Sequence, residues 1–261
     1  MMTAIRRIAA GGALHIYPIA ITALAWQALA HSGIVPGRLF PDLLAIGDAT
    51  GDFLAAGDFW YHSQFTLYRT FAAFVLAAPA GVVIGIALAR MRWVEALFEP
   101  LFTFTYPMPK IALLPIFIMI FGFGSPSKIA LACVEATYPI VLSAYFGVRL
   151  TKRTLVWAAE SMGASRLRIF FRVLLPSALP DILTSFRIAL HVAFVVVILL
   201  EIIGDSTGLG YYITYSASSF DYAGFFAGIL AIMFWGFLLD RLMIALRTRI
   251  VFWVPVSKGG H

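Results

Sequence analysis

Long hydrophobic runs dominate this chain, and short polar segments separate them. A transmembrane helix needs about 20 mostly apolar residues, because the hydrocarbon core of a bilayer is about 30 Å thick. Runs of roughly this length lie at residues 8–30, 65–89, 96–122, 127–148, 182–203 and 223–246. The pattern predicts an all-α membrane protein with about six transmembrane helices, in a single domain that covers residues 1–261.

Two of these runs contain prolines or glycines that affect how a helix forms or packs. Prolines interrupt the third run at Pro100, Pro107, Pro109 and Pro115. A broken backbone at membrane depth is tolerated only inside the protein or beside a water-filled cavity. We therefore expect the third run to lie inside the bundle, near a translocation path. In the second run, Gly81 and Gly85 would let a neighbouring helix approach closely.

The charges between the runs predict the orientation in the membrane. Lys and Arg gather before the first run and after the second, fourth and sixth, whereas residues 31–64 carry four Asp and a single Arg. Because cytoplasmic loops are enriched in Lys and Arg, we expect both termini in the cytoplasm of a multi-pass protein of a bacterial inner membrane. The acidic segment is either an outer connecting loop or part of a docking surface for an external partner. The first run is too long for a signal peptide and is interpreted as a retained span.

Composition excludes several classes of function. Hydrophobic residues make up 61% of the chain and charged residues 12%, about half the charged share of a soluble domain. The net charge of +6 comes from residues at the ends of the runs, so no nucleic-acid surface is expected. The single Cys133 rules out an internal disulfide, and the chain lacks phosphate-loop, zinc-protease and serine-hydrolase motifs. We therefore expect no catalytic residue, no metal site and no cofactor bound by this chain.

Four of the titratable residues inside the runs are selected as candidates, because charge there is costly and often functional. Lys110 lies in the broken third run and either attracts an anionic solute or pairs with a carboxylate, for which Glu135 is the natural candidate. Glu201 either gates an outer mouth or fixes the backbone of the turn that follows. His191 is mid-run and is more typical of a bundle residue than of a proton relay. All four are candidates for a translocation path.

The most polar run lies between the fourth and fifth spans, at residues 154–176. Ala158–Ala159 favour a helix, Gly163 breaks it, and residues 166–172 resume it. This pattern predicts a helix–turn–helix on the cytoplasmic face, after which Pro176 bends the chain back into the membrane.

This loop resembles the EAA loop of ABC importer permeases, written E-A-A-x3-G-x9-I-x-L-P. Ala158–Ala159 stand at the two alanines, Gly163 at the glycine and Leu175–Pro176 at the end, with Val173 in place of isoleucine. Trp157 stands where the family has glutamate, so the contact of that glutamate is left open here. The runs at residues 109–115 and 121–128, and Glu201 with Gly208–Leu209–Gly210, are similar to the nitrate, sulfonate and taurine branch of these permeases.

The resemblance implies the fold of a type I ABC importer permease and a set of partners. These are a second copy of the permease, a cytoplasmic ATP-binding subunit that binds ATP and magnesium, and an extracytoplasmic solute-binding protein. The loop would be the coupling helix that sits in a groove of the ATPase. The residues that it assigns to coupling are Trp157, Ala158, Ala159, Glu160, Gly163, Ala164, Arg166 and Pro176. Its arginines would contact acidic residues of the ATPase or anionic membrane lipid.

The expected function is therefore the membrane subunit of an importer for a small solute, with an anion such as nitrate, a sulfonate or taurine as the favoured cargo. Other members of the family carry uncharged or aromatic solutes, including vitamin precursors. An ion-coupled secondary transporter would also suit a broken helix with few buried charges, although no paired halves are visible. An intramembrane enzyme using Glu135, His191 or Glu201 has no motif in its favour.

Overall fold

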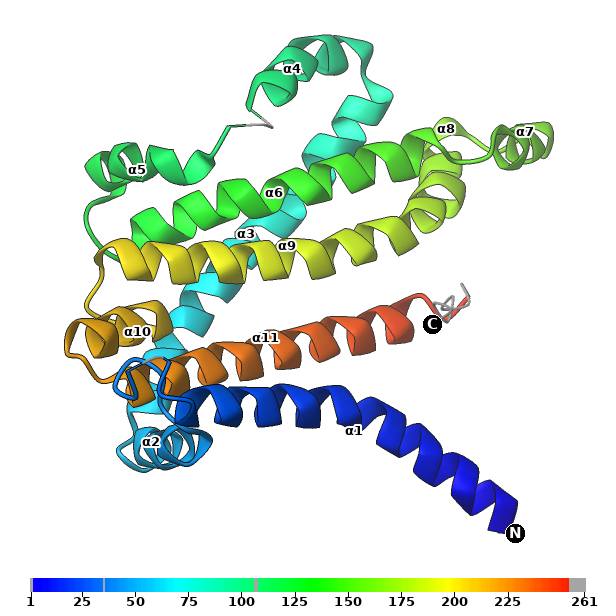
Figure 1. Cartoon of the computed structure of the whole chain (residues 1–261). Helices are drawn as coiled ribbons and strands as arrows, with labels where there is room; N and C mark the ends of the chain where they lie inside the picture. Colours follow the sequence, from blue (N-terminus) through cyan, green and yellow to red (C-terminus); the bar gives the residue numbers. More distant parts are fainter. Residues whose placement is uncertain (1, 35, 106–107, 254–261) are drawn as a thin grey trace. The chain divides into compact units, whose positions relative to one another are not determined.

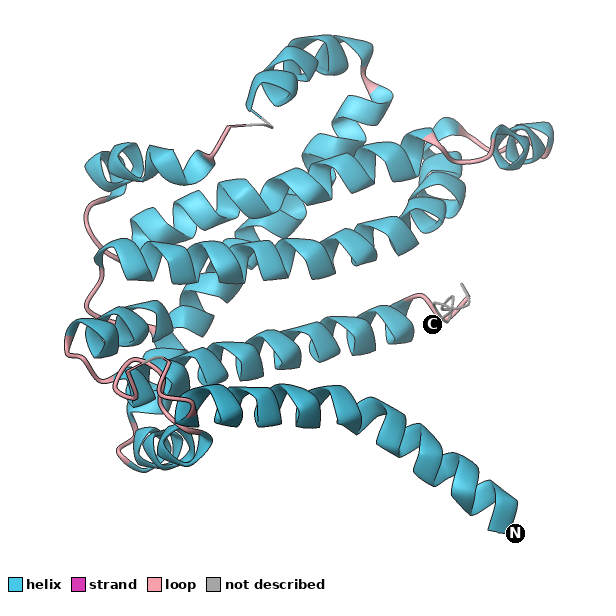
Figure 2. Cartoon of the chain, viewed as in Figure 1, coloured by secondary structure: helices cyan, strands magenta, loops and turns pink. Residues whose placement is uncertain are grey.

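The computed structural model describes residues 2–34, 36–105 and 108–253, which form only helices and loops (Figure 2). Pro107, which was named above, lies outside this described part, and so does Lys258 of the basic segment after the sixth run. The chain divides into two compact units, which are Met1–His62 with Tyr212–Ala231 and Ser63–Tyr211 with Ile232–His261. The expectation of one membrane domain stays a prediction.

The first unit contains α1 (Met2–His31), α2 (Leu43–Ala55) and the starts of α3 (Asp58–Arg90) and α11 (Tyr222–Ile250), with most of α10 (Leu209–Ser218). The acidic segment at residues 31–64, which is predicted to lie outside, thus contains a helix, α2. Asp42 caps it by accepting a hydrogen bond from the N–H of Ala45 at 2.7 Å. Trp26 stacks on Phe40 with ring centroids 4.0 Å apart, and Phe53 stacks on Tyr212 at the same distance.

The second unit carries the helices that surround the candidate site. Besides most of α3 and the end of α11, it contains α4 (Arg92–Thr105), η1 (Lys110–Leu113), α5 (Leu114–Phe121), α6 (Ser125–Arg149), α7 (Arg153–Ser161), α8 (Arg166–Ile169), η2 (Phe170–Leu174) and α9 (Leu175–Gly204). Helices α6 and α9 run side by side and make an extensive helix–helix contact (Figure 1). The pair carries α7 and α8 at one end and α5 at the other (Figure 1).

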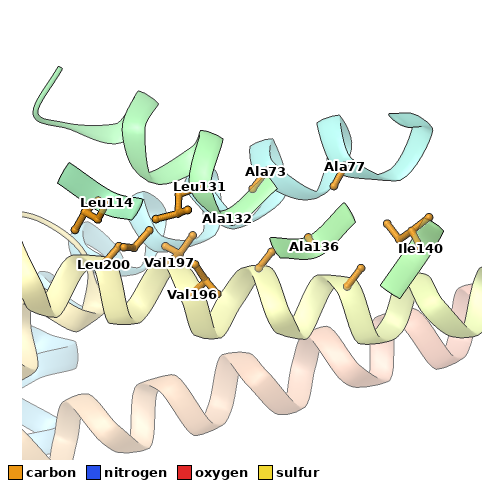
Figure 3. Packing of buried hydrophobic residues seen from close by; sticks show 12 residues of the cluster. Ala73, Ala77, Leu114, Leu131, Ala132, Ala136, Ile140, Val196, Val197 and Leu200 are labelled. Carbon is orange, nitrogen blue, oxygen red and sulfur yellow. The ribbon is translucent and has the colours of Figure 1, made fainter. Parts of the chain in front are cut away.

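Small side chains form the seams of this unit. Ala73 and Ala77 of α3 face Ala132 and Ala136 of α6, and all four are fully buried (Figure 3). A methyl group added at Gly85 would lie 2.5 Å from the carbonyl oxygen of Val141 in α6. Such close backbone approach is typical of membrane helices, which gain little from apolar burial and depend on tight packing. The close approach expected at the glycines of the second run is confirmed.

The helices agree with most of the predicted runs. Four helical stretches in the described residues are long and apolar enough to cross a membrane, and they are Asp58–Arg90, Ser125–Arg149, Arg166–Ser218 and Tyr222–Ile250. They contain the second, fourth, fifth and sixth predicted runs, and α1 contains the first. The third run is interrupted as predicted. Helix α4 ends at Thr105, and a short helix resumes at Lys110 directly after Pro109.

The chain bends near Pro176 as predicted, but the helix is not interrupted there (Figure 1). Helix α8 continues through η2 into α9, so the helix of the fifth span starts well before residue 182. The segment η2 is a π-helical turn, in which the N–H of Leu175 bonds to the carbonyl of Phe170 five residues earlier. A proline ring clashes with the carbonyl four residues before it in an α-helix. The wider π turn directly before Pro176 relieves that clash and lets the helix continue.

Candidate functional site

The loop between α6 and α9 presents a short helix with an exposed apolar surface. In α7, Ala159 is buried, whereas Trp157 is 59% exposed and the following Met162 is 80% exposed. Leu155 on the same helix is also exposed. Apolar side chains gathered at such a position are typical of a surface that another protein covers.

Gly163 ends α7 in a defined geometry. Its φ of +74° lies in the left-handed region that favours glycine. The N–H of Gly163 donates to the carbonyl of Glu160 at 2.8 Å, and the N–H of Ala164 donates to the carbonyl of Ala159 at 3.0 Å. These two bonds form a Schellman motif, which satisfies the last carbonyl groups of the helix. The alanines and the glycine of the loop motif therefore fix the shape of this turn.

The next helix begins immediately after the turn and is basic. The hydroxyl oxygen of Ser165 accepts the N–H of Arg168 at 3.4 Å, which caps α8. Arg166 and Arg168 are exposed to solvent. The guanidinium of Arg90, at the end of α3, lies 5.0 Å above the ring of Phe170. The basic segment is thus anchored to the end of a membrane helix.

Glu201 lies in a buried polar cluster at the opposite end of α9. Its side chain is fully buried, and Oε1 accepts a hydrogen bond from Nη1 of Arg69 at 2.7 Å. Its Oε2 accepts the hydroxyl of Thr66 at 2.8 Å and the N–H of Gly210 at 3.1 Å. The N–H of Leu209 donates in turn to that hydroxyl at 2.9 Å. Of the two roles considered for Glu201, this geometry supports holding the turn backbone.

The cluster extends to further charges that the sequence analysis missed. Nη2 of Arg69 lies 2.9 Å from Oδ2 of Asp205, and Nζ of Lys128 lies 3.0 Å from the same atom. With Glu201, the cluster contains two cations and two carboxylates. Its members come from α3, α6, α9 and the turn after α9. An arginine inside an apolar run is a signal that could have identified Arg69. Its partners are too distant in sequence to be inferred from spacing.

Lys110 and Glu135 form the expected ion pair. Nζ of Lys110 lies 3.4 Å from Oε2 of Glu135 and 4.1 Å from the ring centroid of Tyr138. Lys110 is buried at 6% exposure. The pair ties η1, where the third run resumes, to the middle of α6.

His191 lies beside a third group of charges, on α9 and α11. Its Nδ1 donates to the carbonyl of Arg187 at 2.8 Å, and its Nε2 lies 3.7 Å from Oδ1 of Asp240. Nε of Arg187 donates to the same carboxylate oxygen at 2.6 Å. A cavity of about 600 Å³ is bordered by these three side chains. The sequence analysis selected only His191 from this group.

The predicted path residues therefore lie in three separate places. Lys110 and Glu135 touch each other, while Glu201 and His191 each join charges that were not anticipated. Within the described residues, no group of three His, Cys, Asp or Glu side chains is placed to hold a metal ion. These side chains form ion pairs and border a cavity between helices. Such an arrangement is more typical of a solute path than of an enzyme active site.

Solved transporters share this fold. The MetNI methionine ABC transporter, in an inward-facing conformation, has a chain that matches with a TM-score of 0.60 at 22% identity, covering 72% of this chain and 94% of that one. A chain of an amino acid ABC transporter matches with a TM-score of 0.62 at 16% identity, covering 82% of this chain and 99% of that one.

Proteins found by sequence similarity have higher sequence identity to this chain than these solved structures have. The taurine transport system permease protein TauC of Escherichia coli (strain K12) is 31% identical over 247 residues, which cover 92% of this chain and 89% of that protein. The formylaminopyrimidine transport permease protein ThiX of Halalkalibacterium halodurans is 32% identical over 200 residues, covering 77% and 80%. The model of the family "Binding-protein-dependent transport system inner membrane component" matches residues 77–252. The chain belongs to this family and is the membrane-spanning permease subunit of an ABC importer for a small solute.

Proposed function

We propose that the chain works as a homodimer that docks on a cytoplasmic ATP-binding subunit and receives a small organic anion, with sulfonates favoured, from an external solute-binding protein. ATP and magnesium are bound and ATP is hydrolysed in the partner subunit. Both termini lie in the cytoplasm. The names of relatives that transport taurine or, putatively, aliphatic sulfonates support this class of cargo.

The observation that carries the proposal is the exposed helix α7 with its glycine-based end. Trp157 and Met162 supply an apolar surface outside the bundle, which a groove of the ATP-binding subunit would cover. Trp157 takes the place of the family's glutamate, so docking at this position relies on apolar contact. Glu160 and the arginines of α8 lie exposed at the edge of this surface, where they would pair with charges of the partner or with anionic lipid.

The continuity of the helix explains how movement of the loop would be transmitted to the membrane-spanning helices. Helix α8 passes through η2 into α9 without a flexible joint, and α9 packs along α6. Movement of the ATP-binding subunits would therefore be transmitted as rigid-body motion of this helix pair. An ion-coupled secondary transporter would not need such a loop, and the matching family is one of binding-protein-dependent transport systems.

A substitution at Gly163 tests the docking role. We expect Gly163→Val to weaken co-purification of the ATP-binding subunit by about 5- to 30-fold, because a side chain in the left-handed region costs about 1–2 kcal/mol and disturbs the end of α7. Gly57→Val is the matched control. Gly57 has a φ of +83° and, like Gly163, has no atom within 4 Å of an added Cβ. The two variants introduce the same local strain at different places.

The measurement is the yield and ATPase activity of the complex purified in mild detergent from membranes that contain the tagged chain. Loss of the ATP-binding subunit with Gly163→Val but not with Gly57→Val supports docking through α7. Equal behaviour of the two variants, or a wild-type chain that carries no ATPase, would contradict the proposal. Uptake driven by an ion gradient would then be measured in vesicles without ATP.

A further inference from the structure

A small cavity lies where the end of α3 meets α8 and η2. Its volume is about 300 Å³, at the lower end of the range for small-molecule sites, and it is bordered by Arg90, Arg166, Leu167 and Phe170. Arg90 is the last residue of α3 and directly follows the apolar run at residues 65–89. The cavity therefore lies at the boundary between the hydrocarbon core and water, on the side that the positive charges predict to be cytoplasmic.

The two arginines at this cavity have capacity for an anion. Arg90 and Arg166 are exposed, and within the described part of the chain neither side chain forms a hydrogen bond or an ion pair. The guanidinium of Arg90 lies over the ring of Phe170, 5.0 Å from its centroid. This contact uses the face of the guanidinium, so its N–H groups remain available. Planar N–H forks match the oxygens of a phosphate group.

The surroundings of the cavity are positively charged. Residues 149–172 contain six Lys or Arg and one carboxylate, that of Glu160. Other carboxylates at this end of the bundle lie in an ion pair or at other cavities, and they are Glu95, Glu99 and Asp181. No carboxylate of the described residues is within ion-pair distance of either cavity arginine. The cavity therefore keeps an excess of positive charge, which attracts anions.

Exposed apolar side chains lie close to these arginines along the chain. Leu167 is 70% exposed, Phe171 is 56% exposed, and Trp93 near the start of α4 is 69% exposed. Contact with water makes such exposure costly, whereas aromatic and aliphatic groups at the edge of a bilayer contact the glycerol and the first carbons of the lipid tails. Cationic and apolar contacts beside each other match the two parts of a phospholipid better than a free phosphate ion.

We propose that this cavity binds an anionic phospholipid of the inner leaflet, with its phosphate on Arg90 and Arg166 and its tails beside Leu167. Basic pockets beside membrane helices on the cytoplasmic side hold lipid headgroups by the same chemistry. The inference rests on the proposed function for the cytoplasmic position of this face. It goes further by assigning a ligand to Arg90, which lies outside the coupling loop, and by giving Arg166 a lipid in place of an acidic group of the ATPase.

The two ends of the loop therefore have different partners. The apolar surface of α7 lies beyond the turn at Gly163, and α7 extends away from the helix bundle (Figure 1). An ATP-binding subunit that covers Trp157 would meet α7 first, while the cavity lies against the end of a membrane helix. A bound headgroup would hold α8 against α3 and so fix the loop on which the ATPase docks.

The net charge of the headgroup decides which phospholipid fits. Phosphatidylglycerol is an anion, whereas phosphatidylcholine adds a positive trimethylammonium group beside the same phosphate. Two arginines repel that second charge. The glycerol headgroup instead offers hydroxyl groups, which accept hydrogen bonds from further N–H donors of the guanidinium forks. We therefore expect the cavity to prefer phosphatidylglycerol.

Native mass spectrometry of the permease purified with its ATP-binding subunit tests this assignment. It counts the lipids bound to the intact complex in a non-ionic detergent while either phospholipid is added. Wild type should bind phosphatidylglycerol about tenfold more tightly than phosphatidylcholine. Arg90→Gln should weaken phosphatidylglycerol about fivefold, which is the contribution of one arginine near an anionic surface, and should leave phosphatidylcholine nearly unchanged.

Two variants serve as controls. Arg90→Lys keeps the charge and should lose no more than about twofold, because an ammonium group replaces the planar fork. Arg249→Gln removes an exposed arginine near the end of α11 and should change the binding of neither lipid. Equal binding of the two lipids to wild type, or an unchanged preference in Arg90→Gln, would overturn the proposal.

Two other occupants are distinguished in the same experiment. Displacement of phosphatidylglycerol by millimolar inorganic phosphate would indicate a site for soluble phosphate compounds and would overturn the lipid assignment. Loss of the ATP-binding subunit from Arg90→Gln, with lipid binding unchanged, would assign the arginine to the ATPase and would overturn it as well. The yield of the ATP-binding subunit with wild type reports separately on the proposed function. If no such subunit is retained, the lipids are counted on the chain itself.

Discussion

The buried cluster around Arg69 yields a quantitative prediction about stability. The guanidinium contacts Glu201, Asp205, the hydroxyl oxygen of Ser125 at 3.0 Å, and both the carbonyl and the hydroxyl of Thr207 at 3.0 and 2.8 Å. Its side chain is 3% exposed. Replacing it with methionine keeps much of the volume and removes every one of these contacts.

The expected cost follows from counting charges. In wild type, Arg69 and Lys128 balance Glu201 and Asp205. Arg69→Met leaves one buried negative charge in excess, and Glu201→Gln leaves one positive charge in excess. Breaking a buried ion pair in this way costs about 3–5 kcal/mol. Glu201 keeps two other hydrogen-bond donors, so the cost should be near the lower end, about 3 kcal/mol.

The double variant Arg69→Met/Glu201→Gln restores the balance and should be more stable than the sum of the two single changes predicts, by about 1–3 kcal/mol. The assay is equilibrium unfolding in mixed micelles with increasing SDS, followed by tryptophan fluorescence. Arg38→Met, at an exposed arginine, is the control and should change stability by no more than about 0.5 kcal/mol. A cost below about 1 kcal/mol for Arg69→Met, or strictly additive single changes, would refute the charge-balance argument.

Two other predictions concern the second unit. Gly85→Ala should destabilise the chain by about 1–3 kcal/mol, because the new methyl group meets a carbonyl oxygen of α6 at 2.5 Å, whereas Gly47→Ala, with open space around it, should not; thermal unfolding in detergent compares them. The hydrogen bond from Tyr145, 2.6 Å long, and then Arg149 hold the pKa of Glu95 below its usual value of 4.5. The folded pKa is depressed, so this contribution to stability is present above pH 4.5 and is lost as the pH falls through the folded pKa. Tyr145→Phe should therefore show a smaller drop in thermal midpoint between pH 6 and pH 4 than wild type, and an identical drop would contradict the assignment.

Local patterns accounted for much of the architecture. The runs located the helices because burial in a bilayer imposes length and apolarity on each one. The interruption near Pro109 and the turn at Gly163 followed from the backbone limits of proline and the freedom of glycine. The pair of Lys110 with Glu135 was anticipated because two opposite charges in neighbouring apolar runs have few other partners.

Features that depend on distant residues were not accessible in the same way. Arg69 was visible as a charge within an apolar run, but its bond to Glu201 joins residues 132 positions apart. The cavity beside His191 likewise needs Asp240, which a different helix supplies. Helix α2 was missed although Asp42 before two leucines is a readable capping signal. Its segment was interpreted from its acidity alone.

The π turn at Phe170–Leu174 sets the angular position of α7 and α8 relative to α9. A helix gains about 100° per residue, because one turn takes 3.6 residues. Removing one residue from this turn would restore α-helical pairing and rotate everything before it by about 100° around the axis of α9. Trp157 would then face a different side while every helix kept its length. The one extra residue of the π turn therefore determines toward which side the exposed apolar surface of α7 faces relative to α9.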